Sequence, residues 1–199
     1  MSISSETQLC NNALILLGQS TITAINEGTP TANVCQQLYA PTRNDLLAQH
    51  FWNFATKRVS IASDAVAPVF EWANSYQLPA DFFRVKKIYD SDADYIIESD
   101  KILTDQTTEL KLVYIAKITD TVAFSPLFTT ALIARMAMLL CQQIKGSDSS
   151  LPALQQMYME ALRTAKIADA QDGTPEALTA NSYQDARMGS MRNWETRDI

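Results

Sequence analysis

The apolar residues of this chain change their spacing twice, from a helical period to a strand period and back. Before residue 57 they recur every three or four positions, which predicts helices with one buried face. Through residues 57–118 they alternate in short runs, as in strands, and from residue 119 the helical spacing returns. We therefore expect a mainly α fold with a β insert (α+β). It would combine an antiparallel helical bundle (residues 1–56 and 119–173) with a small antiparallel β-sheet insertion (residues 57–118).

Capping signals bound the helices that precede the insert. Ser5 and Gln8 form a capping box at the start of the first helix, and Gly18 ends it. Thr29 caps a second helix, with a proline in its first turn. Pro41 lies within the continuing apolar pattern and leaves two alternatives. The segment up to residue 54 is either one long helix bent at this proline or two short helices that meet there.

Two further helices are expected after the insert. Residues 127–144 are apolar almost all round, which predicts the central helix of the bundle, begun by Pro126 and ended by Gly146. The last helix begins near Ser150 and ends before Gly173. The most apolar window, residues 127–141, is too short to span a bilayer and contains an arginine, so no membrane is expected among the partners.

The insert shows five short strand patterns. Residues 58–62, the segment around 82–89, and residues 109–118 each read as a strand, the last with clear alternation. Residues 95–97 and 102–103 flank a polar turn and read as a hairpin. We expect these strands to form one small sheet.

The aromatic residues gather where the helical pattern gives way to strands, at residues 49–85. This stretch holds the only histidine of the chain, His50, and two of its three tryptophans. A histidine base needs a nucleophile and an orienting acid in reach, and no such motif is visible in the sequence. We therefore interpret His50 as a packing residue and expect no catalytic residues.

Metal and cofactor sites are not predicted either. One histidine and the scattered thiols Cys10, Cys35 and Cys141 lack the spacing of a zinc site, and we expect buried free thiols. The five glycines are too far apart for a phosphate-binding loop. Asp90, Asp92 and Asp94 favour a solvated turn, with a weak divalent-ion site as the alternative.

The formal net charge of −6 argues against a protein that grips nucleic acid by itself. It is compatible with a conduit that lets DNA slide past. The insert nevertheless carries a basic element, which we expect to face DNA or an acidic neighbour. It would lie on an edge strand or on a strand covered by another subunit. Its members are Lys57, Arg58, Arg84, Lys86 and Lys87.

Several segments resemble the tail tubular protein A family, the head-to-tail adaptors (connectors) of short-tailed bacteriophages. They are ALILLG (13–18), EGTPTANVC (27–35), RNDLL (43–47), WNFATKR (52–58) and YQLPAD (76–81). The apolar helix pattern of residues 124–146 also fits. The likeness runs in order from about residue 9 to residue 172 and leaves the polar C-terminal segment outside.

The resemblance implies a homo-oligomeric ring of about twelve copies beneath the portal protein of the capsid. Its hole would continue the channel for genomic DNA, without sequence recognition, and its far side would dock the tail nozzle protein. The chain would then belong to the virion, at the capsid–tail junction, after assembly from the host cytoplasm.

Two sets of contact residues are expected in such a ring, because aromatic, Met and Arg side chains dominate the centres of interfaces. Residues 174–199, too polar to fold alone, would be an extended C-terminal arm that binds the portal. Its expected anchors are Tyr183, Arg187, Met188, Met191 and Trp194. The insert would meet the neighbouring subunit or the nozzle through Trp72, Tyr76, Phe82 and Arg84.

The sequence leaves a second class of function open. A small cytosolic helical binding or regulatory protein, whose C-terminal tail folds on one partner, would show the same polar tail. A hydrolase would require paired acid and base groups, and none are visible. A ring stacked on a portal would favour the adaptor, and a one-to-one complex would favour the regulator.

Overall fold

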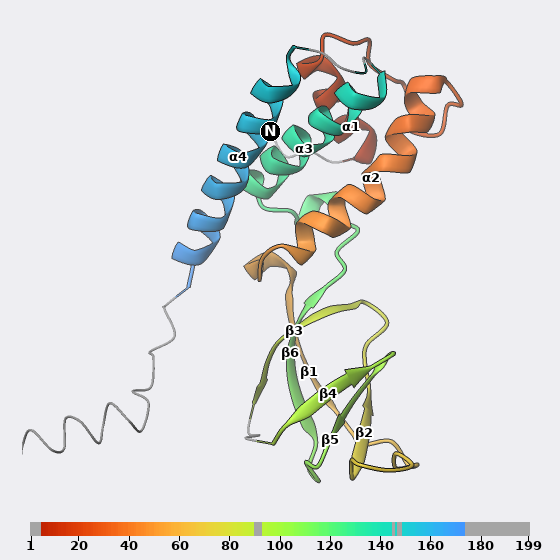
Figure 1. Cartoon of the computed structure of the whole chain (residues 1–199), viewed down its shortest axis with the longest axis vertical. Helices are drawn as coiled ribbons and strands as arrows, with labels where there is room; N and C mark the ends of the chain where they lie inside the picture. The colour runs from red at the N-terminus through yellow and green to blue at the C-terminus, as the bar shows by residue number, and fades with distance from the viewer. Residues whose placement is uncertain (1–4, 90–92, 145, 147–148, 174–199) are drawn as a thin grey trace, which may run out of the picture. The chain divides into compact units, whose positions relative to one another are not determined.

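The computed structural model of the chain describes residues 5–89, 93–144, 146 and 149–173. In this part the chain forms four α-helices and two three-stranded antiparallel sheets (Figure 1), so the predicted α+β fold is confirmed. The helices are α1 (Glu6–Leu16), α2 (Pro30–Ala48), α3 (Pro126–Ile144) and α4 (Leu151–Gln171). The strands are β1 (Thr56–Ile61), β2 (Asn74–Gln77), β3 (Phe82–Tyr89), β4 (Tyr95–Glu98), β5 (Lys101–Thr104) and β6 (Leu110–Ala116).

The first two helices begin where the capping signals predicted, and α1 also ends where predicted. The Ser5 hydroxyl accepts a hydrogen bond from the Gln8 amide at 3.2 Å, and the Thr29 hydroxyl accepts one from the Ala32 amide at 3.3 Å. Gly18 adopts a φ of 66°, a left-handed conformation that glycine tolerates best, directly after α1. These residues satisfy backbone groups that a helix end would otherwise leave without partners.

Helix α2 is continuous through Pro41, so the alternative of two short helices is wrong. Pro41 is exposed, and water can therefore bond the carbonyl that loses its amide partner. The expectation that the helical segment continues to residue 54 is also wrong, because α2 ends at Ala48. The indole N–H of Trp52 bonds the Leu46 carbonyl at 2.9 Å and occupies the acceptor that the next helical amide would have used.

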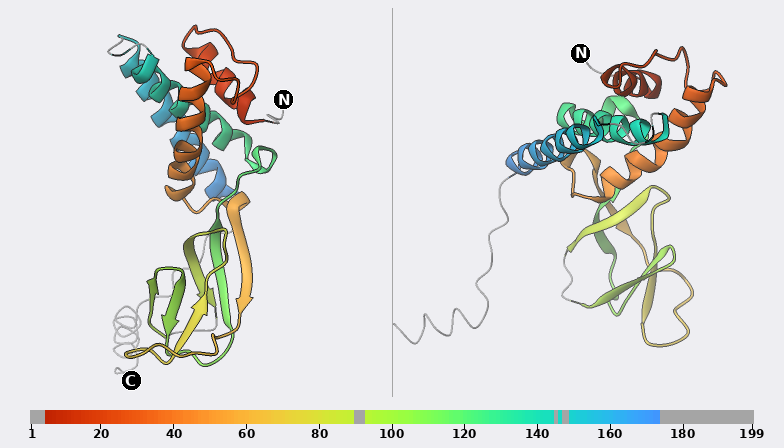
Figure 2. Two further views of the ribbon diagram at one scale, coloured as in Figure 1. Left: turned by 90° about the vertical axis from the view of Figure 1, so that its right-hand side faces the viewer. Right: turned by 45° about the horizontal axis from the view of Figure 1, so that its top comes forward.

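Helix α3 contacts α1 and α2, and the views of Figure 2 show these helices side by side. It is the described helix whose length and composition would allow it to cross a membrane, yet 56% of that stretch is buried inside the protein. Arg135, in its middle, lies over the Tyr158 ring of α4 at 5.0 Å. Helix α3 thus packs as the core helix that its apolar pattern predicted.

An aromatic cluster closes the helical core next to the first strand. Trp52 and Phe54 both meet Phe128 of α3, with ring centroids 5.1 and 4.9 Å apart. Phe124 lies 5.1 Å from Phe128 and 6.0 Å from Phe54. Tilted and edge-on pairs at these distances are favourable beyond the area that they bury. The segment that joins α2 to β1 is therefore fixed to α3.

The insert contains two sheets instead of the single sheet expected from the sequence. The first has the strand order β1-β6-β3, and the second has the order β2-β5-β4 (Figure 1). The sequence patterns did not predict β2, which pairs with β5 and so gives the β4–β5 hairpin a third strand. A separate core joins the inner faces of the two sheets, a sandwich arrangement. Its buried members are Tyr76, Leu78, Ile102, Leu110, Leu112, Tyr114 and Ala116.

Both faces of β6 are apolar at its end near the helices. Tyr114 and Ala116 face the sandwich core, and Ile115 between them belongs to the helical core. The expected alternation of apolar and polar side chains therefore holds only at the start of this strand, where Lys111 is exposed. Strand β6 joins the two cores because it pairs with both β1 and β3.

Replacing Trp52 with phenylalanine tests whether the indole bond ends α2. The ring still fits the cluster, but the buried Leu46 carbonyl keeps only its bond from the Gln49 amide, so we expect a loss of about 0.5–1.5 kcal/mol in the free energy of unfolding. Urea unfolding at neutral pH measures this loss. Phe70→Ala is the control, because Phe70 is exposed and its loss should change stability by less than about 0.5 kcal/mol. Equal effects of the two changes would contradict this role of Trp52.

Candidate interaction surfaces

The outer face of the first sheet is basic. Residues opposite each other in antiparallel strands share a face. Val113 of β6 lies between Arg58 of β1 and Lys87 of β3, and Lys111 of β6 lies opposite Tyr89. Arg84 lies opposite Ile115 on the same face. We call this surface the basic sheet face, and its members are Arg58, Arg84, Lys87, Tyr89 and Lys111.

Two irregularities in the register of β3 produce this arrangement. They lie between Phe82 and Arg84 and between Val85 and Lys87. Regular alternation along this strand would place Arg84 and Lys86 together on one face and Lys87 on the other. Each irregularity adds a residue, so Lys87 replaces Lys86 beside Arg84 on the outer face. The predicted edge position of β3 is confirmed within the described sheet.

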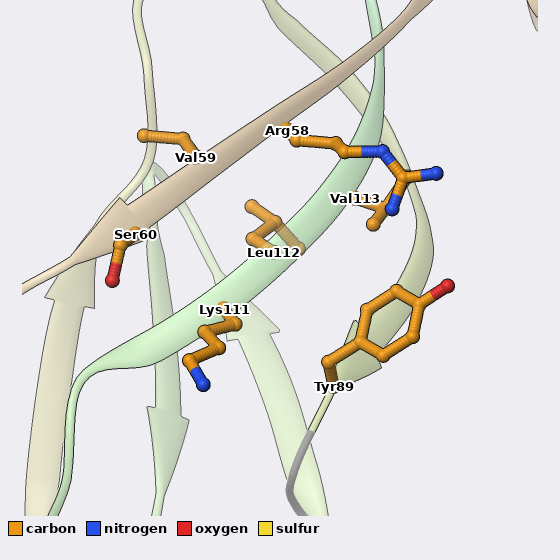
Figure 3. Close-up of a pocket in the computed structure, with 7 residues that line it drawn as sticks. All are labelled: Arg58, Val59, Ser60, Tyr89, Lys111, Leu112 and Val113. Atoms are coloured by element: carbon orange, nitrogen blue, oxygen red, sulfur yellow. The ribbon is translucent and has the colours of Figure 1, made fainter.

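A shallow hollow of about 440 Å³ lies on the basic sheet face (Figure 3). The guanidinium carbon of Arg58 lies 5.9 Å from the centre of the Tyr89 ring, and the Lys87 ammonium lies 5.1 Å from it. Such cation–π contacts hold the charged groups around the ring. Among the described residues, the Glu109 carboxylate is close and accepts a hydrogen bond from the Ser60 hydroxyl at 2.7 Å. The hollow can accept an anionic group beside an aromatic one.

The outer face of the second sheet has a different character. Residues 63–73 form a loop whose Val69 and Phe70 are 96% and 74% exposed. The loop borders a hollow of about 370 Å³ together with Glu98 of β4 and Leu103 of β5. We call this the apolar loop surface, and its members are Val66, Val69, Phe70, Glu71, Ile96 and Glu98.

This loop is held at both ends and strained near its tip. The Asp64 amide bonds the Ser75 carbonyl at 2.8 Å, and the Ala73 amide bonds the Asp105 carboxylate at 2.9 Å. Glu71 has a φ of 69°, and the amide after it bonds the carbonyl before it at 2.9 Å. Such tight positive-φ turns are rare and strained. The strained turn lies directly after the exposed Phe70.

A carboxylate–ammonium pair lies beneath the loop. The Lys101 ammonium lies 2.8 Å from Asp64, which also accepts from the Ser75 hydroxyl. These bonds hold the pKa of the Asp64 carboxyl below its ordinary value, and the Asp64 bond raises the pKa of Lys101. Lys101 is therefore paired with Asp64 within the chain, whereas Glu71 and Glu98 give the loop surface its acidic margin.

The four residues predicted to contact a neighbour have different surroundings. Tyr76 is completely buried, and its hydroxyl donates to the Gln106 and Thr108 carbonyls, so its predicted place on a contact surface is wrong. Its side chain organises the sandwich core. Phe82 is half-buried against Tyr114, and Trp72 is half-buried beside the hollow of the loop surface.

Arg84 links the insert to α2. Its guanidinium lies 4.2 Å from the centre of the Phe51 ring and donates to the Ala48 carbonyl at 3.3 Å. A cation at the end of a helix is stabilised by the helix dipole. Arg84 is also exposed, so a second contact with a neighbour stays a prediction.

His50 lies just beyond α2 and contacts a carboxylate that sequence reasoning missed. Its Nε2 atom is 3.2 Å from the buried Asp169, which also accepts a bond from the Asn53 amide at 2.9 Å. The Asn53 side chain donates to the Asp169 carbonyl. These bonds fasten the segment after α2 to α4. Asp169 follows Ala165 by four positions on the buried side of that helix, and this spacing could have indicated it.

The three cysteines are buried free thiols, as expected. A hydrogen bond with Cys35, together with burial, raises the pKa of the Cys10 thiol. Across residues 5–89, 93–144, 146 and 149–173, no group of three or more His, Cys, Asp or Glu side chains is arranged to hold a metal ion. Asp94 is exposed, whereas Asp90 and Asp92 lie outside the described residues, as do all five predicted anchors of the C-terminal arm.

No protein-family model matches this chain, and no curated protein matches it either.

The YQLPAD segment (76–81) ends in an ion pair whose contribution to stability should depend on pH. Asp81 accepts from the Lys57 ammonium at 2.6 Å and from the Tyr114 hydroxyl at 2.9 Å. The Lys57 bond lowers the pKa of Asp81 below its ordinary value of 3.8. Burial, aided by Asp81, raises the pKa of Tyr114 to about 12.

Asp81→Asn should lower the free energy of unfolding at pH 7 by about 0.5–1 kcal/mol, a modest value because the pair is partly exposed. The pKa of Asp81 is lower in the folded chain than in the unfolded chain. The stabilisation is therefore complete above the pKa of the unfolded chain, and it is lost as the pH falls through the pKa of the folded chain. Urea unfolding of both proteins from pH 7 to pH 3 should show the difference shrinking. Asp45→Asn, an exposed position on α2, is the control. A difference that stays constant on acidification would contradict the ion pair's role.

Proposed function

We propose that this chain is a structural head-to-tail adaptor of a bacteriophage, assembled as a ring beneath the portal. Its ordered likeness to the tail tubular protein A family, given above, is the first support. The second is where the acid–base side chains and the exposed apolar side chains lie. Those with a capacity for acid–base chemistry, such as His50 and Asp169, bond within the chain, whereas the strained loop around Phe70 points outward.

One observation carries the proposal furthest: the insert presents two outward surfaces of different character. A lone monomer gains nothing from an apolar segment held in water by a strained turn. A subunit with neighbours on both sides requires two contact surfaces, and the basic sheet face and the apolar loop surface meet that requirement.

The proposed assembly has the following parts. The helices form an antiparallel bundle in each of about twelve subunits, around a channel through which DNA passes without sequence recognition. The C-terminal arm of each copy binds the portal, and contacts that are weak one at a time are multiplied around the ring. The opposite side receives the tail nozzle. The protein acts by assembly without catalysis, in the virion at the capsid–tail junction.

Removal of the arm tests the portal contact. A chain without residues 174–199 should keep its fold, since the described helices and both cores end before this segment. It should lose measurable binding to the portal protein encoded in the same genome, monitored by co-sedimentation and circular dichroism. Portal binding at full strength by the shortened chain would contradict the proposal.

Single substitutions in the arm give a finer comparison. Trp194→Ala should weaken portal binding at least about tenfold, as expected for an aromatic anchor. Ser190→Ala is the matched control and should change binding by less than about twofold, because small polar residues seldom carry interface energy.

A further inference from the structure

The two outward surfaces of the insert lie on opposite sides of the sandwich. The inner face of the first sheet holds Leu112 and Tyr114, and the inner face of the second holds Tyr76 and Ile102. Since side chains alternate across a strand, the other faces of both sheets point away from this shared core. The basic sheet face and the apolar loop surface therefore point in opposing directions.

The charges of these surfaces are complementary. Arg58 lines one hollow beside Tyr89, and among the described residues Glu109 is an acidic side chain close to it. The other hollow has Glu71 and Glu98 at its margin, and its lysine is already paired with Asp64. Opposite potentials that face each other stabilise a contact and select its partner.

Their apolar parts also complement each other. Phe70 and Val69 are largely exposed in the single chain. A neighbouring subunit would cover them. Tyr89, exposed by 40% between Arg58 and Lys87, offers an aromatic ring to a partner. An aromatic centre within a charged margin is the usual composition of a protein–protein contact.

A protein partner fits the basic sheet face better than nucleic acid does. The chain has a net charge of −6, so a polyanion approaching it meets overall repulsion. A surface of this same chain brings carboxylates at fixed positions together with apolar groups that need cover. The complementary surface is therefore present on every copy.

We infer that the basic sheet face of one copy docks on the apolar loop surface of the next copy. Tyr89 of one subunit enters the hollow beside Phe70 of its neighbour, and Arg58 faces Glu98. This inference rests on the proposed function, which requires repeated copies, and it names the surfaces that join them. A contact between two different surfaces is head-to-tail, so repetition yields a ring or an open chain of subunits.

Charge reversal with mixing tests this contact. Arg58→Glu and Glu98→Lys should each weaken self-association of the full chain at least about tenfold, measured by sedimentation velocity. An equimolar mixture of the two variants should recover association, because the reversed surface of each now matches the reversed surface of the other. Recovery on mixing also shows that both variants are folded. Arg163→Glu and Glu160→Lys, exposed on α4, are matched controls that should associate like the unaltered chain.

Several results would overturn the inference. These are an unaltered chain that stays monomeric up to about 1 mM, reversals without effect, or a mixture that does not recover. If Arg58→Glu abolishes binding to a short oligonucleotide and leaves self-association unchanged, the basic sheet face is a nucleic-acid site instead. Rings that keep their subunit number on the portal after both reversals would reject this contact and leave the proposed function intact. Failure of the unaltered chain to bind the portal would reject the proposed function itself.

Discussion

Strand β6 holds the two cores of this protein together. Ile115 packs among the helices, while Tyr114 and Leu112 on its other face pack into the sandwich. The strand also pairs with β1 and β3, so it fixes the register of the whole first sheet. The position of every outward residue of the insert follows from it, because opposite residues share a face and a shift of one position would reverse that face.

Polar groups at the junction of helices and insert are used for structure. Asp169 receives the Asn53 amide and contacts His50, Arg84 bonds the end of α2, and Asp81 bonds Lys57. The Asp169 bonds join the segment after α2 to α4, the Arg84 bond joins β3 to α2, and the Asp81 bond joins the start of β3 to β1. Arg84 thereby holds the insert to α2 by a directional bond as well as by apolar packing.

Helix ends and strand positions followed from local chemistry in the sequence. Ser5, Thr29 and Gly18 act within a few residues of themselves, and the alternation of β6 and the β4–β5 hairpin was also visible. The features that were missed depend on distant residues. The end of α2 requires the indole of Trp52, strand β2 requires β5, and Asp169 meets His50 only in the folded chain.

The candidate surfaces show the same division. The basic character of the insert was evident, but the register irregularities of β3 decide which cations share a face. The burial of Tyr76 could not be read from a motif, because it depends on the second sheet. The exposed strain at Glu71 has no sequence signal at all, since the residue there is not glycine.

If these side chains serve assembly, the chain occupies a fixed place in a phage particle. A reconstruction of the intact virion by electron cryomicroscopy, with this chain traced in the map, tests it most directly. We expect a closed ring of copies between the portal and the nozzle, with the insert of each copy against its neighbour. Density for this chain elsewhere in the particle, or a particle without it, would contradict the account.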